Sequence, residues 1–283
     1  MRYFWIDMEN IPVSTIHLFP VLEEQLIQLL HSLTPAEWNK QTIARLWTVK
    51  DVAAHLLDGN IKGLSMMRDD YFNDPPGNIY TNNDLINYLN GLNADWIHAM
   101  KRVSPKTLTS LLETTGAAYY HELTLLDPFK PAVFSVSWAG ETTSFNWFHI
   151  AREYTERWHH QQQIREAVGK TGLMTKELYH PVLDTFMMAL PYTYRNANAP
   201  ANTVIQVSIS GEAGGNWFLV KKDNWELLKT NNLPATAQCN IDGDIAWKLF
   251  TKSWRKDDVQ KYVSITGNVL LGEIVLDMVS VMA

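Results

Sequence analysis

The stretch Asn146–Lys170 constrains this chain most, because its pattern predicts one long helix that carries several ligand-type side chains. At about 100° per residue, four of these side chains fall within about 60° of one another on the helical wheel. They are His149, Glu153, Glu156 and His160. Apolar residues such as Ile164 share this face. A carboxylate on an apolar face needs a cation, a proton or a metal to compensate its charge. The stretch therefore predicts a polar site inside a helical bundle.

The spacing of Glu156 and His160 favours a metal site, because residues four apart on a helix can present two ligands to one ion. A third ligand is expected on an earlier helix, which Thr48 begins as N-cap with Asp51 in a capping-box position. His55 follows one turn later and is expected to point inward. A bundle that brings His55 beside Glu156 and His160 forms a His2Glu site with an open position, which is typical of catalytic zinc.

Two alternatives remain for the ligand set. His159 can take the place of His160, and Glu153 can take the place of Glu156. Adjacent residues lie about 100° apart around a helix, so His159 and His160 are not expected to bind one ion together easily. A further alternative is a polar network without metal, since one inward histidine is more often a hydrogen-bonded core residue than a ligand.

Two motifs carry a resemblance to a known family. The motif WTVKDVAAHL ends one residue after His55, and EYTERWHHQQQIREAVG follows about a hundred residues later. Together they resemble the DinB-like, maleylpyruvate-isomerase-type metal-binding domain found in mycothiol-dependent maleylpyruvate isomerase and related thiol S-transferases. The resemblance implies an up-down four-helix bundle over residues 1–172, in which His55, Glu156 and His160 hold a divalent metal, typically zinc. The family often has an aspartate two or three positions after the His pair, where this chain has Gln162 and Gln163.

The resemblance also implies an activity. A metal-dependent enzyme of this type would use a low-molecular-weight thiol, of the mycothiol or bacillithiol type, for S-transfer or for isomerisation of an activated double bond. His149 and Glu153 are expected to orient the ligands, and Trp138 and His121 are expected near the substrate pocket. The alternatives are a non-enzymatic protein that binds a metal or an apolar ligand, and a metal-dependent hydrolase on the same bundle.

The pattern changes after Lys170 and predicts a second domain over residues 173–283. Alternation over Thr203–Ser210 predicts a strand, and the glycine-rich GEAGGN that follows predicts a hairpin. Cys239 alternates with apolar neighbours, which indicates a buried position. The order of strands and helices resembles a sterol-carrier-protein-like domain. The predicted fold class is therefore α+β with two domains, a DinB-like up-down four-helix bundle and a small C-terminal α+β domain.

Periodicity and turn residues give the remaining elements. Apolar residues at helical spacing predict four further helices, at Ile11–Leu33, Thr48–Phe72, Asn83–Arg102 and Ser104–Thr115. Gly116–Thr143 is expected to be less regular, with PAVFSVSW as a short strand or an extended lid. Leu270–Val281 is expected to be a helix.

Composition limits the partners. The net charge of -6 without a basic run argues against nucleic acid, which needs a clustered positive surface. No apolar run is long enough to predict a membrane span, and the acidic N-terminus argues against an export signal. The single cysteine excludes an internal disulfide and favours the reducing cytoplasm. A small-molecule substrate is expected. The stripe of Trp147, Tyr154 and Trp158 is expected to pack against another domain of the chain or against a second copy of it in a homodimer.

Overall fold

The computed structural model describes residues 11–73 and 77–281, which form two compact units. The bundle unit comprises residues 16–126 and 156–172, and the sheet unit comprises residues 11–15, 127–155 and 173–281. One long helix crosses from the sheet unit to the bundle unit between Thr155 and Glu156. The predicted domain boundary between residues 172 and 173 stays a prediction. Most of the N-terminal segment used to argue against export lies outside the described residues, as does part of the predicted loop after Asn73.

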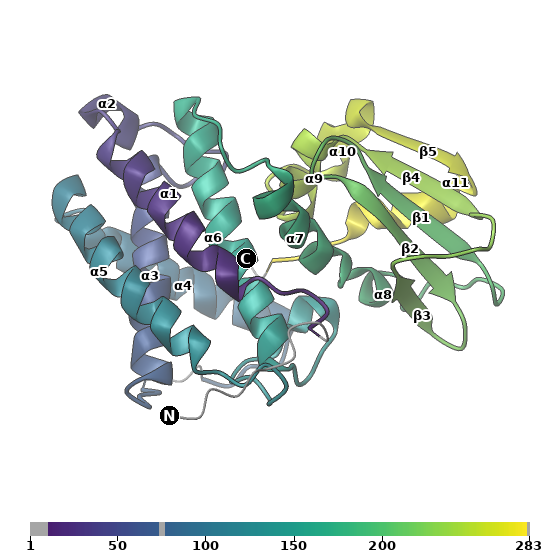
Figure 1. Ribbon diagram of the computed structural model, residues 1–283, viewed down its shortest axis with the longest axis horizontal. Coiled ribbons are helices and arrows are strands. Elements are labelled where there is room, and N and C mark those ends of the chain that lie inside the picture. The colour runs from purple at the N-terminus through teal and green to yellow at the C-terminus, as the bar shows by residue number, and fades with distance from the viewer. Residues whose placement is uncertain (1–10, 74–76, 282–283) are drawn as a thin grey trace. The chain divides into compact units, whose positions relative to one another are not determined.

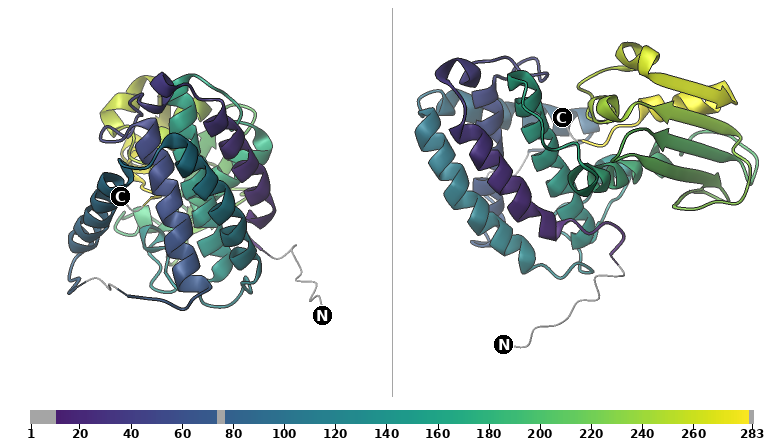
Figure 2. Two further views of the ribbon diagram at one scale, coloured as in Figure 1. Left: turned by 90° about the vertical axis from the view of Figure 1, so that its left-hand side faces the viewer. Right: turned by 45° about the horizontal axis from the view of Figure 1, so that its top comes forward.

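The bundle unit consists of helices (Figure 1). They are α1 (Phe19–His31) after a 3-10 turn at Ile16–Leu18, α2 (Pro35–Trp38), α3 (Val49–Met67), α4 (Asn82–Met100), α5 (Pro105–Thr124) and α6 (Asn146–Val168), whose first part belongs to the sheet unit. α5 packs against both α1 and α3, and α4 lies beside α3 at the edge of the bundle (Figure 2, left). Thr48 caps α3 through the predicted capping box with Asp51.

The apolar core of the bundle unit joins α1, α3, α4, α5 and α6. Leu57, Leu108, Leu112 and Ile164 are fully buried in it. Complete burial of an aliphatic side chain contributes about 1.5–3 kcal/mol, so these contacts across helices hold the bundle together. The core places the inward face of α6 against α3, which is the arrangement that the candidate metal site requires.

Two helix boundaries in the bundle differ from the sequence-based expectation. α1 begins at Phe19 rather than Ile11, and α5 continues to Thr124 rather than ending near Thr115. The sequence predicts a less regular region from Gly116 onwards, and this prediction is wrong for residues 116–124. Gly116 is tolerated within α5 because α1 packs closely there, and a Cβ at Gly116 would lie 2.2 Å from Oε1 of Glu23.

The sheet unit contains a five-stranded sheet in the order β3-β2-β1-β4-β5 (Figure 1). The strands are β1 (Val204–Ile209), β2 (Gly215–Lys221), β3 (Trp225–Leu228), β4 (Ala237–Ile241) and β5 (Val263–Gly267). β1 and β4 are parallel, and every other neighbouring pair is antiparallel. The helical segments are α7 (Lys176–Met187), α8 (Leu190–Thr193), α9 (Gly243–Phe250), α10 (Lys256–Val259) and α11 (Val269–Glu273), with 3-10 turns at Ser137–Ala139, Gln260–Tyr262 and Ile274–Asp277. The predicted fold class, a helical bundle with a small α+β domain, is confirmed.

The predicted hairpin is confirmed, because β1 and β2 pair from Ile209 and Gly215 at the turn. Gly211 adopts a φ of +89°, a conformation that favours glycine. Val207, Trp217 and Cys239 are neighbours on one face of the sheet and are buried. The residues before and after each of them along the strands are exposed or half-buried. Helices α7 and α9 are held together beside the sheet by Tyr179, whose hydroxyl donates to the Gly243 carbonyl. The right-hand view of Figure 2 shows the strands of this unit.

Two segments of the sheet unit differ in part from the sequence-based expectation. Of the two alternatives for PAVFSVSW, the short strand does not form among the described residues, where one isolated bridge joins Pro131 to Phe145, and the extended lid stays a prediction. The predicted helix over Leu270–Val281 ends after α11 and a 3-10 turn. The chain then runs without helix as far as Ser280, whose backbone amide donates to the Phe250 carbonyl and whose hydroxyl donates to the Phe186 carbonyl.

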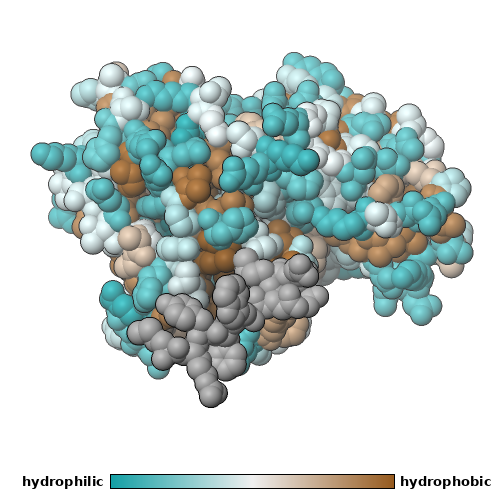
Figure 3. All heavy atoms as spheres, viewed as in Figure 1, coloured by the Kyte–Doolittle hydropathy of each residue, from teal (hydrophilic) through white to brown (hydrophobic). Residues whose placement is uncertain are grey.

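Hydrophobic residues are mostly inside both units. Figure 3 shows that hydrophilic residues cover much of the face drawn there, with hydrophobic residues in separate groups between them. Among the helices that the structure describes, none combines the length and the apolar character needed to cross a bilayer.

Candidate metal centre

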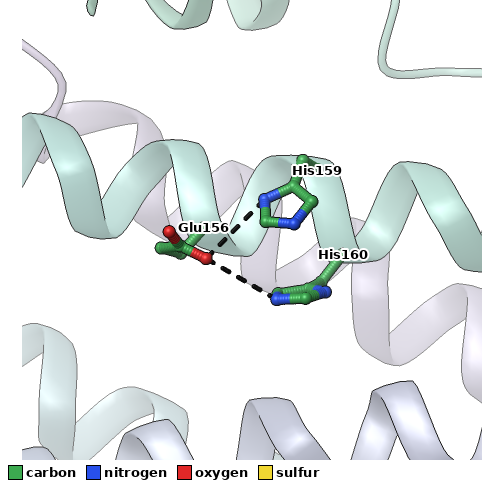
Figure 4. Close-up of side chains that lie close together, drawn as sticks. All are labelled: Glu156, His159 and His160. Atoms are coloured by element: carbon green, nitrogen blue, oxygen red, sulfur yellow. Dashed lines mark ion pairs between the residues drawn. The ribbon is translucent and has the colours of Figure 1, made fainter. Parts of the chain in front are cut away.

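Three residues of α6 form the cluster with metal-ligand geometry: Glu156, His159 and His160 (Figure 4). One ligand atom from each lies within 4.8 Å of those of the other two. Oε2 of Glu156 lies 3.6 Å from Nε2 of His160 and 3.8 Å from Nδ1 of His159. Two donors bound to one zinc ion at tetrahedral angles lie about 3.4 Å apart. The observed separations are close to that value, so small side-chain rotations would let this set hold an ion.

A hydrogen bond orients the imidazole of His160. Its Nδ1 lies 2.9 Å from Oε1 of Gln163, one turn along α6. An amide oxygen only accepts, so Nδ1 carries the proton and Nε2 keeps its lone pair towards Glu156. Metal-bound histidines usually have their second nitrogen held in this way. Gln163 was identified from the sequence only as a departure from the family pattern, although its spacing of three residues from His160 could have indicated the contact.

His55 of α3 lies beside this cluster, as the predicted bundle requires. The centroid of its ring is 4.7 Å from that of His160 and 4.8 Å from that of Trp47. Trp47 also approaches the His160 ring, with 6.1 Å between centroids. Trp47 begins the WTVKDVAAHL motif and immediately precedes the cap of α3, but the sequence analysis does not predict it as a site residue. Two helices thus bring His55 beside His160, but His55 is not in the cluster whose ligand atoms lie within 4.8 Å of one another. The role of His55, Glu156 and His160 as a ligand set stays a prediction.

His159 remains an alternative ligand. The residues start about 100° apart around the helix, yet the ring centroids of His159 and His160 are only 3.9 Å apart. Both rings are buried, whereas the Glu156 side chain is 30% exposed. Rotation about the two side-chain bonds of each histidine brings the rings together although the positions point in different directions. The angle between the two positions on the helix therefore does not exclude His159 as a ligand.

The two residues expected to orient the ligands, His149 and Glu153, are joined through Arg152 in the sheet unit. The Arg152 guanidinium donates to Nδ1 of His149 at 2.6 Å and to Oε1 of Glu153 at 2.9 Å. Burial lowers the pKa of His149 to about 4, the Glu153 carboxylate raises it, and the Arg152 charge lowers it further. His149 is therefore neutral at pH 7. The ion pair with Arg152 also gives Glu153 a partner other than a metal.

Three other residues considered in the sequence analysis are Trp138, His121 and Cys239. Trp138 is buried, and its ring meets that of Phe148 edge-on with 5.7 Å between centroids. Its part in a substrate pocket stays a prediction. His121 is exposed on α5. Cys239 is fully buried in the sheet, where burial raises the pKa of its thiol to about 12. A thiol in that environment is a poor nucleophile at neutral pH.

The fold and the cluster together define a class: a helical bundle with a His/Glu cluster suited to a divalent metal, followed by a small α+β domain. Residues 19–165 match the family described as the mycothiol maleylpyruvate isomerase N-terminal domain. The chain belongs to this family.

Solved structures show the same fold. The crystal structure of a mycothiol-dependent maleylpyruvate isomerase matches with a TM-score of 0.53 and 11% sequence identity, and a mutant of such an isomerase matches with the same score and 10% identity. Each match covers 89% of this chain and 91% of the other. No curated protein matches the chain.

Proposed function

We propose that the chain is a divalent-metal-dependent enzyme that acts on a small electrophilic substrate with the help of a low-molecular-weight thiol. The enzyme either isomerises the substrate or transfers the thiol to it. The observation that carries the proposal is the cluster of Glu156, His159 and His160 on α6, with the His55 ring of α3 beside that of His160. Family membership supports the thiol, since the family is named for a mycothiol-dependent isomerase. A thiol of the bacillithiol type would serve the same chemistry.

The donor set fits a divalent ion, and zinc in particular. Imidazole nitrogens and a carboxylate oxygen are among the usual ligands of zinc, and catalytic zinc keeps one position open. In this proposal, His55, Glu156 and His160 hold the ion, and Gln163 keeps the His160 imidazole in the tautomer that presents Nε2. A bound divalent ion lowers the pKa of a thiol or water that reaches it, so that the nucleophile is available near pH 7.

The first experiment measures metal content by plasma mass spectrometry on protein without an affinity tag. About one zinc ion per chain is expected in the parent. Little is expected in His160→Ala, whereas His121→Ala is the matched control because that histidine is exposed on α5. Full occupancy in His160→Ala, or no metal in a parent supplied with zinc, would refute the site.

The second experiment tests the reaction. The zinc-loaded protein is assayed with mycothiol, bacillithiol and a simpler thiol on maleylpyruvate-like and other electrophilic substrates, and without thiol on amides and esters. Thiol-dependent turnover that disappears in His160→Ala supports the proposal. Hydrolysis without thiol would establish the hydrolase alternative. Metal binding with no turnover of either kind would favour a non-catalytic binding protein.

The proposal extends to location and partners. We place the protein in the cytoplasm, where small thiols are kept reduced. Its expected ligand is a small molecule, and neither nucleic acid nor a membrane is a proposed partner. Homodimer formation stays a prediction, which sedimentation of the purified protein tests.

A further inference from the structure

A second polar centre lies in the bundle unit, in a cleft between α1 and α5 that is separate from the metal cluster in its residues. The cleft has a volume of about 350 Å³. Its lining includes the rings of Phe19, Tyr119 and Tyr120 and the charged side chains of Glu23 and Arg157. Figure 1 shows α1 and α5 side by side. Small-molecule sites in proteins are typically clefts of about 300–1,000 Å³, mostly apolar with a few convergent polar groups.

Arg157 forms the innermost part of this centre and already has its own partners. Its side chain is only 10% exposed, and its NH1 lies 3.6 Å from Oε2 of Glu23. Its NH2 donates to Oδ1 of Asn60 on α3. The guanidinium carbon lies 4.5 Å from the centroid of the Tyr119 ring, within the range of a cation–π contact. Arg157 is therefore fixed by three neighbouring helices, and it faces a cleft in which carboxylates outnumber cations.

Glu23 has an acceptor that the protein does not use. Its Oε1 is buried and accepts no hydrogen bond from any residue that the structure describes. A buried acceptor without a donor costs about 1–3 kcal/mol, and more when it is charged. Burial raises the pKa of Glu23, and the Arg157 charge opposes this shift. Gly116 leaves the space that this oxygen occupies, since a Cβ there would lie 2.2 Å from it.

The charges of the cleft indicate the kind of ligand. Glu24 and Glu113 line it together with Glu23, so three carboxylates face one guanidinium. A cation with N–H groups would pair with the part of the Glu23 carboxylate that faces the cleft and would reduce the negative excess. The aromatic rings give a surface on which an apolar body and a positive charge both pack well. An anion would meet Arg157, but only after displacing its pairing with Glu23.

We propose that the cleft between α1 and α5 binds a small organic ammonium ion with an aryl or short alkyl body, whose N–H groups pair with the carboxylate of Glu23 that lines the cleft. This site is distinct from the metal centre and does not depend on the proposed thiol chemistry. The ligand lies against Phe19 and Tyr120, and Arg157 holds the second oxygen of the same carboxylate.

Titration calorimetry with three matched probes tests the proposal: benzylammonium, benzyl alcohol and benzoate. Benzylammonium is expected to bind more tightly than the neutral and anionic probes. In Glu23→Gln, its affinity should fall about tenfold or more, because a charged hydrogen bond is replaced by a neutral one. Glu166→Gln is the matched control, because Glu166 is exposed on α6 and does not line the cleft. The affinity of Glu166→Gln for benzylammonium should equal that of the parent.

A second variant protects the test against a change in folding. Gly116→Ala adds one methyl group where Oε1 of Glu23 lies, so it should weaken benzylammonium binding without removing a charge. Circular dichroism establishes that each variant is folded. Any one of the following results would overturn the proposal: no binding of benzylammonium at millimolar concentration, equal binding of benzyl alcohol, or unchanged affinity in folded Glu23→Gln. Preferred binding of benzoate would do so as well, because it would make Arg157 the recognition group.

Discussion

His149 should make the protein lose stability as the pH falls below 6.5. Burial lowers the pKa of this imidazole to about 4 in the folded protein, against an ordinary value of 6.5. Between these two values the unfolded chain binds a proton that the folded protein excludes, so the stabilisation is complete above pH 6.5 and is lost as the pH falls. The gap of about 2.5 units, at about 1.4 kcal/mol per unit, corresponds to about 3 kcal/mol in total.

Urea unfolding at pH 7.5 and pH 5.0 measures this effect, with His149→Gln as the comparison. Glutamine can accept the hydrogen bond from Arg152 but does not titrate. From pH 7.5 to pH 5.0 the parent should lose about 2 kcal/mol more than the variant. His121→Gln, at an exposed histidine, should lose as much as the parent. An equal loss in parent and His149→Gln would refute the reasoning, as would an NMR titration of His149 with a midpoint near 6.5.

Two further predictions concern packing and thiol reactivity. Gly63→Ala should destabilise the bundle by about 1–3 kcal/mol in urea unfolding, because its Cβ would lie 2.1 Å from the buried Tyr119 ring. An increase in stability would contradict this close contact between α3 and α5. Cys239 should react with iodoacetamide at pH 8 only after unfolding, since burial raises the pKa of its thiol to about 12; rapid labelling of the native protein, followed by mass spectrometry, would contradict its buried position.

The sequence was most informative where local chemistry determines the structure. Thr48 and Asp51 form the capping box that their spacing predicts, and this sets the start of α3 and the position of His55 along it. The face shared by Glu156 and His160 follows directly from the period of the helix. The hairpin between β1 and β2 follows from alternation and glycine content, which are also local properties.

The sequence was less informative where contacts between distant segments decide. The continuation of α5 through Gly116 depends on the close approach of α1, which periodicity within α5 does not contain. The extended end of the chain depends on carbonyl groups of Phe186 and Phe250 that accept hydrogen bonds from Ser280. The pairing of Glu23 with Arg157 joins residues far apart in the chain. None of these contacts produces a pattern in a short stretch of sequence.

The number of histidines at the metal centre decides between catalysis and a structural role. His159 and His160 cluster with Glu156, and the ring of His55 lies beside that of His160. Four protein ligands would close a tetrahedral zinc site and leave no position for a thiol. Catalysis therefore requires that one of His55 and His159 stay unbound. Zinc affinity in His55→Ala and His159→Ala tests this requirement. A large loss in one variant and a small loss in the other supports an open site, whereas large losses in both would indicate a closed site and favour the non-enzymatic alternative.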